Sequence, residues 1–128
     1  MSDTSINNEI SINGETYIKK SAQPSMAVEL NGMRCCIVRT YSAGVFVGYV
    51  KARDGREVTL VKARRLWRWT GAASLSELAI RGTSNPGGCK FPAAVPEVVL
   101  TEAIEIIPCT HDAIESICNV PEWSAHDE

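Results

Sequence analysis

The chain has 128 residues, of which 45% are hydrophobic, and a formal net charge of −2. This length fits one domain with a modest core, and no apolar run approaches the roughly 18 residues of a membrane helix. The polar start MSDTSINNEISING lacks the basic and apolar regions of a secretory signal peptide. We therefore expect a cytoplasmic protein that does not associate with a membrane.

Charge is distributed unevenly along the chain. Residues 34–90 contain eleven Lys and Arg residues and three acids, whereas the remaining residues contain two Lys residues and twelve acids. A basic centre between acidic ends attracts anionic partners by long-range electrostatics. The alternative is a solvated pair of strands whose arginines pair with the acidic segments of the same chain.

The five cysteines do not predict a disulfide framework, because their number is odd and a cytoplasmic compartment is reducing. The adjacent Cys35 and Cys36 lie in an apolar run and are expected to pack as small hydrophobic residues. The cysteines and His111 form no paired C-x-x-C spacing, so no metal site is expected.

Residues 1–25 are rich in Ser, Asn and Thr, and we expect a flexible arm followed by one domain over residues 26–128. The β-branched segments 34–40, 45–50 and 58–61 predict three strands of a β-meander. Asp54-Gly55 is a hairpin signal, and Gly48 permits a bulge or a close approach between backbones. A bend over residues 62–64 is expected to lead into a fourth strand.

That fourth strand, Arg65 to Trp69, belongs to the sequence RRLWRW at positions 64–69, which holds two of the three tryptophans. Alternation in a strand would place Arg65, Trp67 and Trp69 on one face and Arg64, Leu66 and Arg68 on the other. A core strand would not carry arginine on both faces. Guanidinium groups match phosphate geometry and indoles stack on bases. The segment therefore predicts a site for an anionic ligand with a flat ring.

The turn Ser42-Ala43-Gly44 follows Arg39-Thr40-Tyr41. Small residues let backbone N–H groups approach a phosphate, and such groups form anion-binding concavities. Arg39 and Tyr41 would add a guanidinium and a ring to that site. The alternative is an ordinary hairpin turn.

The second half of the chain predicts two helices. Ser74-Leu75-Ser76-Glu77 is a capping-box pattern, so we expect a helix from Ser74 to about Gly82. A second helix is expected after Thr110, with Ile114, Ile117 and Cys118 facing the core.

Between these helices, residues 95–100 resemble a strand, and residues 101–108 suit either state but favour a strand because Ile-Glu-Ile-Ile is β-branched. Pro121 ends the second helix, and Trp123 is expected to fold back onto the body or to lie at a subunit interface. The fold class is thus α+β, with an antiparallel meander in the N-terminal half and two helices in the C-terminal half.

Enzyme motifs are absent from the sequence, including G-x-S-x-G, the Walker loop, G-x-G-x-x-G and H-E-x-x-H. Glu102 and Glu105 could act as an acid–base pair, although most such pairs only solvate a surface. We expect no enzyme and no cofactor, and a nucleotide hydrolase is the least favoured alternative.

Five segments carry a resemblance to a known family: VRTYSAGV (38–45), ARRLWRW (63–69), GAA (71–73), CKF (89–91) and TEAIEIIPC (101–109). Together they resemble the Thoeris anti-defence family of phage proteins, in particular its first-described type. The likeness extends over about residues 34–123 and does not include the N-terminal arm.

The resemblance implies a sponge and not an enzyme. Members of that family bind cyclic ADP-ribose isomers made by bacterial TIR-domain proteins, glycocyclic ADP-ribose among them, and hold them intact, so that the Thoeris effector is never activated. The family forms dimers that can assemble into hexamers, and some members also bind cyclic di- or trinucleotides at separate sites. Such a protein would act in the cytoplasm of the infected bacterial host, as a homo-oligomer without DNA, RNA or membrane partners.

The chemistry of such a ligand assigns roles to the residues of both motifs. Arg39 and Arg65 would clamp the pyrophosphate, Trp67 or Phe91 would stack on adenine, and the 41–44 turn would supply backbone donors. The expected ligand-binding residues are Arg39, Thr40, Tyr41, Ser42, Ala43, Gly44, Arg64, Arg65, Trp67, Trp69 and Phe91. We expect their pocket at or near a dimer interface.

Some of these assignments have alternatives. Trp69 could belong to the core, and Arg64 or Arg68 could serve a second site or an interface. The main alternative function is a small nucleic-acid-binding module that uses the same basic, aromatic sheet, and its affinity would fall steeply with salt.

Overall fold

The computed structural model describes residues 25–124, so the expected N-terminal arm lies outside the described residues apart from Ser25. The described chain forms one five-stranded antiparallel sheet and two α-helices, which confirms the α+β class. The order is β1 (Cys35–Thr40), β2 (Val45–Asp54), β3 (Glu57–Arg65), α1 (Leu75–Arg81), the 3-10 turn η2 (Pro86–Gly88), β4 (Val95–Leu100), β5 (Ala103–Pro108) and α2 (His111–Cys118).

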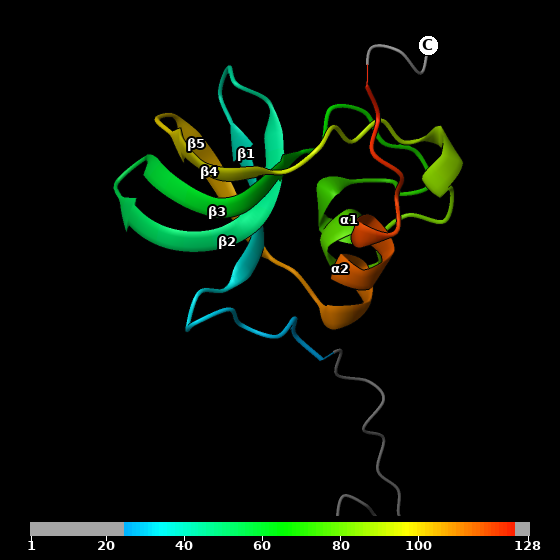
Figure 1. The fold of residues 1–128 in the computed structure, drawn as a ribbon, viewed down its shortest axis with the longest axis horizontal. Helices are drawn as coiled ribbons and strands as arrows, with labels where there is room; N and C mark the ends of the chain where they lie inside the picture. Colours follow the sequence, from blue (N-terminus) through cyan, green and yellow to red (C-terminus); the bar gives the residue numbers. More distant parts are fainter. Residues whose placement is uncertain (1–24, 125–128) are drawn as a thin grey trace, which may run out of the picture.

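The sheet is strongly curled. Its strand order is β4-β3-β2-β1-β5, so β4 and β5 lie at opposite edges although only Thr101 and Glu102 separate them in the chain. A connection this short requires the two edges to approach each other. The N–H of Ala103 donates to the carbonyl of Arg56 at 2.9 Å, which ties the start of β5 to the β2–β3 turn. Figure 1 shows the curled sheet beside the paired helices.

Each face of the sheet covers its own hydrophobic core. Inside the curl, Val38, Phe46 and Leu60 pack with side chains from both edge strands. On the other face, Ile37 and Val47 pack against a core to which both helices and the segments around them contribute. Neighbouring residues along a strand therefore enter different cores, as strand alternation requires.

The β2–β3 hairpin confirms two features of the sequence. Asp54 pairs with Glu57 across the turn, and the register shifts between Val47 and Tyr49, so a bulge of β3 lies opposite Gly48. A Cβ on Gly48 would stand 3.1 Å from the Cα of Ala63, closer than side chains normally pack. The expected bend over residues 62–64 is therefore an irregularity inside one continuous strand.

The predicted fourth strand over residues 65–69 is wrong. β3 runs on to Arg65 and ends there, and the N–H of Leu66 makes the last hydrogen bond toward β2, to Val45 at 2.8 Å. The side chain of Leu66 is buried in the core on the helix side, which draws the chain away from the sheet. Beyond it, Arg68 forms only an isolated bridge with Lys90. Tertiary burial thus overrides the strand propensity of this aromatic segment.

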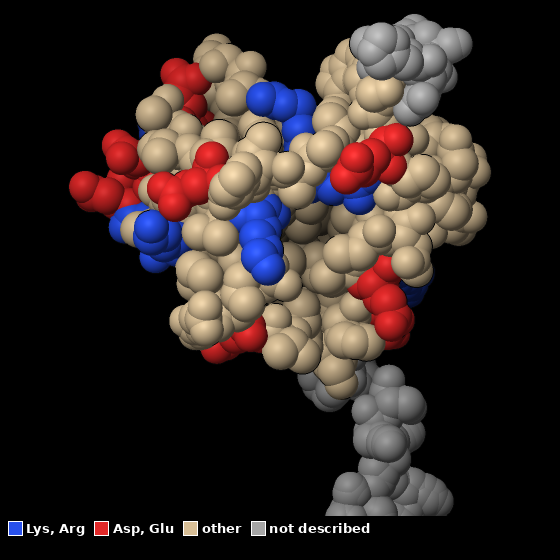
Figure 2. Space-filling view, in the orientation of Figure 1, with Lys and Arg blue, Asp and Glu red and all other residues tan. Residues whose placement is uncertain are grey.

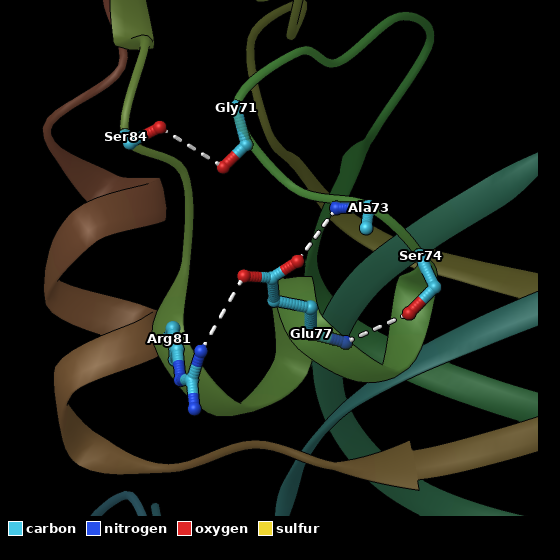
Figure 3. A network of polar contacts seen from close by, with 6 residues as sticks. All are labelled: Gly71, Ala73, Ser74, Glu77, Arg81 and Ser84. Atoms are coloured by element: carbon cyan, nitrogen blue, oxygen red, sulfur yellow. Dashed lines mark hydrogen bonds and ion pairs between the residues drawn. The ribbon is translucent and has the colours of Figure 1, made fainter.

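The first helix begins as the capping box predicts. The Ser74 hydroxyl accepts from the N–H of Glu77 at 3.2 Å, and the Glu77 carboxylate accepts from the N–H of Ala73 at 2.7 Å. The same carboxylate lies 3.7 Å from Arg81 one turn later. Figure 3 shows these contacts together with the hydrogen bond from Ser84 to Gly71.

The second helix also confirms its prediction, with one exception. The Thr110 hydroxyl caps α2 by accepting from the N–H of Ala113 at 3.1 Å, and Ile117 is buried. Cys118 is exposed, so its predicted place in the core is wrong. Neither helix within residues 25–124 is long and apolar enough to cross a membrane.

The close contact between the two helices depends on Gly82, and we expect Gly82→Ala to destabilise the fold. Gly82 has φ 73° and ψ −151°, and an added Cβ would lie 2.3 Å from the Cβ of Ser116. Backbone strain and overpacking together should lower the free energy of unfolding by about 3 kcal/mol. Chemical denaturation measures this change.

The matched control is Gly87→Ala, because nothing lies within 4 Å of a Cβ at Gly87. Its effect should stay within about 0.5 kcal/mol. Equal effects of the two substitutions would contradict the packing seen at Gly82.

Candidate functional site

A cavity of about 310 Å³ opens where the β1–β2 turn meets the segment that leaves β3. It forms because Leu66 hydrogen-bonds Val45 and Arg65 pairs with Phe46, which brings the two motifs of the sequence together. Six of the eleven expected residues line it. The lining residues are Ser42, Ala43, Gly44, Val45, Arg65, Leu66, Trp67 and Trp69.

Arg65 is the charged group of this cavity. Its Nη1 donates to the carbonyl oxygen of Ala43, and the guanidinium carbon lies 4.3 Å from the centroid of the Phe46 ring. These two contacts hold the guanidinium in place at an exposed position. Its other N–H donors have no partner among residues 25–124, so they are available to an anion.

The turn at residues 42–44 was expected to offer backbone N–H donors to a phosphate, but the structure gives it a different role. The N–H of Ala43 already donates to the Thr40 hydroxyl at 2.9 Å, and that hydroxyl donates to the carbonyl of Gly44 at 2.7 Å. Gly44 has φ 99°, which favours glycine, and a Cβ there would lie 3.3 Å from Nη1 of Arg65. Thr40 and Gly44 thus shape the turn so that the Ala43 carbonyl can orient Arg65.

The two tryptophans of the motif have different environments. Trp67 is 57% exposed, and its ring centroid lies 4.6 Å from that of Trp123 at an interplanar angle of 38°. Trp69 is half-buried and packs against the core on the helix side while it lines the cavity. Trp67 is therefore the ring best placed to stack on a ligand.

Trp123 is a residue of this region whose partner the sequence did not reveal. It folds back onto the body, where its backbone N–H donates to the carbonyl of Phe91 at 3.0 Å. The Nζ of Lys90 lies 5.3 Å from its ring centroid. An isolated tryptophan after the last helix carries no signal for contact with Trp67, which lies more than fifty positions earlier.

Arg39 does not join Arg65 in a clamp. Cross-strand partners share a face, and Arg39 pairs with Val45 whereas Arg65 pairs with Phe46, the next residue. The two arginines therefore stand on opposite faces of the sheet. Arg39 donates from Nε to Glu105 at 2.9 Å. The expected pair of phosphate-binding arginines is not assembled within one chain.

Tyr41 and Phe91 lie outside the cavity lining for opposite reasons. Tyr41 is 77% exposed at the adjacent turn, so it stands near the cavity without forming its wall. Phe91 is fully buried, and stacking on a ligand base is impossible while the core is intact. The sequence around Phe91, an apolar ring after Lys90, did not indicate whether that ring would be exposed or buried.

Arg64 is a structural residue and not a ligand-binding one. Its guanidinium donates to four carbonyl oxygens at distances of 2.8–3.1 Å and lies 5.5 Å from the Phe91 ring centroid. Burial lowers the pKa of Arg64 from its usual value. The four carbonyls belong to Phe91, Pro92, Ile117 and Val120.

The basic centre of the sequence is partly neutralised in the fold. Glu105 pairs with Arg39, and Glu97 lies 3.2 Å from Lys51, so acids beyond residue 90 meet cations of the basic region. At these positions the basic residues pair with acidic segments of the same chain, which was the alternative to an anion-binding surface. Figure 2 shows acidic and basic side chains interspersed on the face in view. Arg39 and Lys51 are thus less available to an anion than Arg65 is.

The two acids considered for catalysis have different partners. Glu102 accepts from the hydroxyl of Ser42, a residue of the cavity wall, at 2.6 Å, whereas Glu105 is engaged by Arg39. Within the described range 25–124, a single group of metal-ligating side chains converges, and it consists of exposed residues at the start of α2, His111, Asp112 and Glu115.

We expect Arg64→Met to lower the free energy of unfolding by about 3 kcal/mol, because it leaves several carbonyls without a charged donor. Arg68→Met is the matched control, since Arg68 lies on the same segment with an exposed side chain. Its effect should be below about 0.5 kcal/mol. Urea denaturation of both variants measures the difference, and equal stability would contradict a structural role for Arg64.

Comparison with known proteins adds a family but no activity. No curated protein matches the chain, and no solved structure matches it. A family model matches residues 33–117, more than half of the chain, and this range contains every residue that lines the cavity but not Trp123. The chain therefore belongs to the family described as a domain of unknown function, DUF6948.

Proposed function

We propose that this protein binds and sequesters cyclic ADP-ribose isomers, the immune signals of TIR-domain proteins, without cleaving them. It would act in the cytoplasm of an infected bacterial host and so prevent activation of the Thoeris effector. The observation that carries the proposal is the guanidinium of Arg65, held by Ala43 and Phe46 beside the exposed ring of Trp67. The resemblance of the same segments to the Thoeris anti-defence family supports it.

The chemistry of the cavity fits the parts of such a ligand. Cyclic ADP-ribose carries a pyrophosphate, two riboses and an adenine. The free N–H donors of Arg65 suit a phosphate oxygen pair, and Trp67 offers a stacking surface worth about 1–3 kcal/mol for a base. The Trp69 indole and the polar groups of the turn complete the wall. The pyrophosphate and the adenine thus each have a matching group on one side of the cavity.

The cavity of one chain covers only part of a ligand of this size. Its volume of about 310 Å³ is at the low end of the range for ligand pockets. Tyr41 and Trp67 expose large aromatic surfaces beside it, and exposed aromatic residues favour protein interfaces. We propose that a second copy of the chain covers the open side, which would supply the burial that tight sequestration needs.

A nucleic-acid-binding module is the alternative, and the composition of the cavity wall favours the small ligand. A polyanion is held by many phosphate contacts along a basic surface. Here Arg39 and Lys51 are paired with acids, and Arg65 is the one arginine in the cavity wall.

The direct test of sequestration is capture followed by release. The protein is incubated with glycocyclic ADP-ribose and filtered, and the retained fraction is heated and analysed by mass spectrometry. We expect no ligand in the filtrate and unchanged ligand after heating. A hydrolysed product would show an enzyme, and ligand left in the filtrate would contradict binding.

If the ligand stays in the filtrate, binding of a labelled single-stranded oligonucleotide measured against salt distinguishes the alternative. Steep weakening with rising salt is expected of a nucleic-acid module. Poor oligonucleotide binding at every salt concentration is what the proposal predicts.

We expect Arg65→Gln to weaken the affinity for glycocyclic ADP-ribose by about 10–100-fold, because a charged hydrogen bond to phosphate is worth about 1.5–3 kcal/mol. Calorimetric titration measures the affinity, and thermal melting verifies the fold. Arg65→Lys should recover only part of the affinity, since an ammonium cannot form the two-pronged contact.

The matched control is Arg68→Gln, which removes the same charge three residues away without touching the cavity wall. It should bind as the unsubstituted protein does. Equal losses in both variants would show a general charge effect, and a collapse of the melting temperature in Arg65→Gln would show that Arg65 is structural.

A further inference from the structure

Two of the five cysteines lie side by side at the end of the molecule away from the proposed site. The β1–β5 register pairs Cys36 with Pro108, so Cys35 and Cys109 are the next opposed positions. The N–H of Cys109 donates to the carbonyl of Cys35 at 3.0 Å, which extends the ladder to this pair. Opposed residues share a face, and both thiols belong to the core on the helix side.

This arrangement meets the geometric requirement for a disulfide. Opposed residues of antiparallel strands have Cα atoms about 4.5–5.5 Å apart, and disulfides span Cα separations of about 4.4–6.8 Å. Each thiol also shifts the pKa of the other, which places the two side chains near each other.

A small reagent has a route to these thiols. A cavity of about 280 Å³ is lined by both cysteines and by Arg34, Glu29 and the chain around Met26. Cys35 is 6% exposed and Cys109 is 1% exposed, so Cys35 is the thiol that solvent reaches first. Cys36, on the other face of β1, does not line this cavity.

The two thiols also differ in their surroundings. The interaction with Cys109 lowers the pKa of Cys35, whereas the interaction with Cys35 and burial raise the pKa of Cys109. Burial raises the pKa of the neighbouring Cys36. The thiolate is the nucleophile in disulfide exchange, and the greater exposure of Cys35 makes it the expected attacking group and Cys109 the resolving one.

We propose that Cys35 and Cys109 form a redox-active dithiol that low-molecular-weight disulfides oxidise to an intramolecular disulfide. The Cys35 thiolate attacks one sulfur of oxidised glutathione and expels one glutathione thiolate. Cys109 then loses its proton, attacks the Cys35 sulfur of the mixed disulfide and expels the second glutathione. One oxidised glutathione is reduced to two thiols while the protein loses two hydrogens.

The bond would join the start of β1 to the segment that leads into α2, and it would close a long loop of the chain. Disulfides that close long loops stabilise the folded state. The oxidised protein should therefore melt at a higher temperature than the reduced one. Cys35 and Thr40 are the two ends of β1, about 17 Å apart at strand spacing. The proposed ligand cavity should keep its shape.

The test treats the reduced, folded full chain with oxidised glutathione, followed by tryptic mapping without reduction. Trypsin places Cys35 and Cys36 in the peptide 35–39, and Cys109 and Cys118 in the peptide 91–128. We expect these two peptides to be linked. Fragmentation of the linked pair should place the bond at Cys35 and Cys109, together with a rise in melting temperature.

The matched variant Cys36→Ala/Cys118→Ser removes the other thiols of both peptides and should keep the link. Addition of Cys35→Ser should abolish it. A glutathione adduct on the exposed Cys118 without a link, a bond through Cys36, or no reaction would each overturn the proposal. The result does not depend on ligand binding, so it can fail while the proposed function stands.

Discussion

Two adjacent arginines at the end of β3 determine most of what this molecule can do. Strand alternation sends Arg64 and Arg65 to opposite faces of the sheet. Arg64 turns toward the helices and donates to four carbonyls, which ties β3 to the chain after Phe91 and to the end of α2. Arg65 turns outward to the turn at Ala43. The same dipeptide thus joins the sheet to the helices and supplies the charge of the cavity.

The dependence extends to the aromatic residues that follow. Once Leu66 is buried on the helix side, the chain must leave the sheet, and Trp67 and Trp69 are placed along the cavity wall outside any strand. Trp67 then meets Trp123, whose backbone is held at Phe91 next to the carbonyls that Arg64 binds. Loss of the Arg64 contacts would therefore disturb the proposed site indirectly.

Much of the fold could be predicted from the sequence, because its signals are local. The capping residue Ser74, the hairpin at Asp54 and the β-branched run before Pro108 each act within a few positions. The sequence also placed the turn at residues 42–44 in one site with Arg65 and the tryptophans, since both motifs flank strands that pair. Prediction from the sequence failed where one residue type can serve either the core or a ligand site.

The sequence alone could not distinguish a structural role from a ligand-binding one. Arg64 and Arg65 are chemically identical, and the choice between carbonyls and a ligand depends on which core each residue faces. Arg39 is diverted by Glu105, a partner 66 positions away. Phe91 looks like a stacking ring until the burial of its whole surface is known. Each of these outcomes follows from long-range register, which a pattern of residue types does not contain.

Arg65 and Trp67 are the residues that we propose hold a ligand with a phosphate and a flat ring. A crystal structure of the protein with glycocyclic ADP-ribose is the decisive measurement. We expect a phosphate oxygen within hydrogen-bond distance of the Arg65 guanidinium and the adenine stacked on Trp67. Ligand bound elsewhere, with Arg65 still in contact only with Ala43 and Phe46, would contradict it.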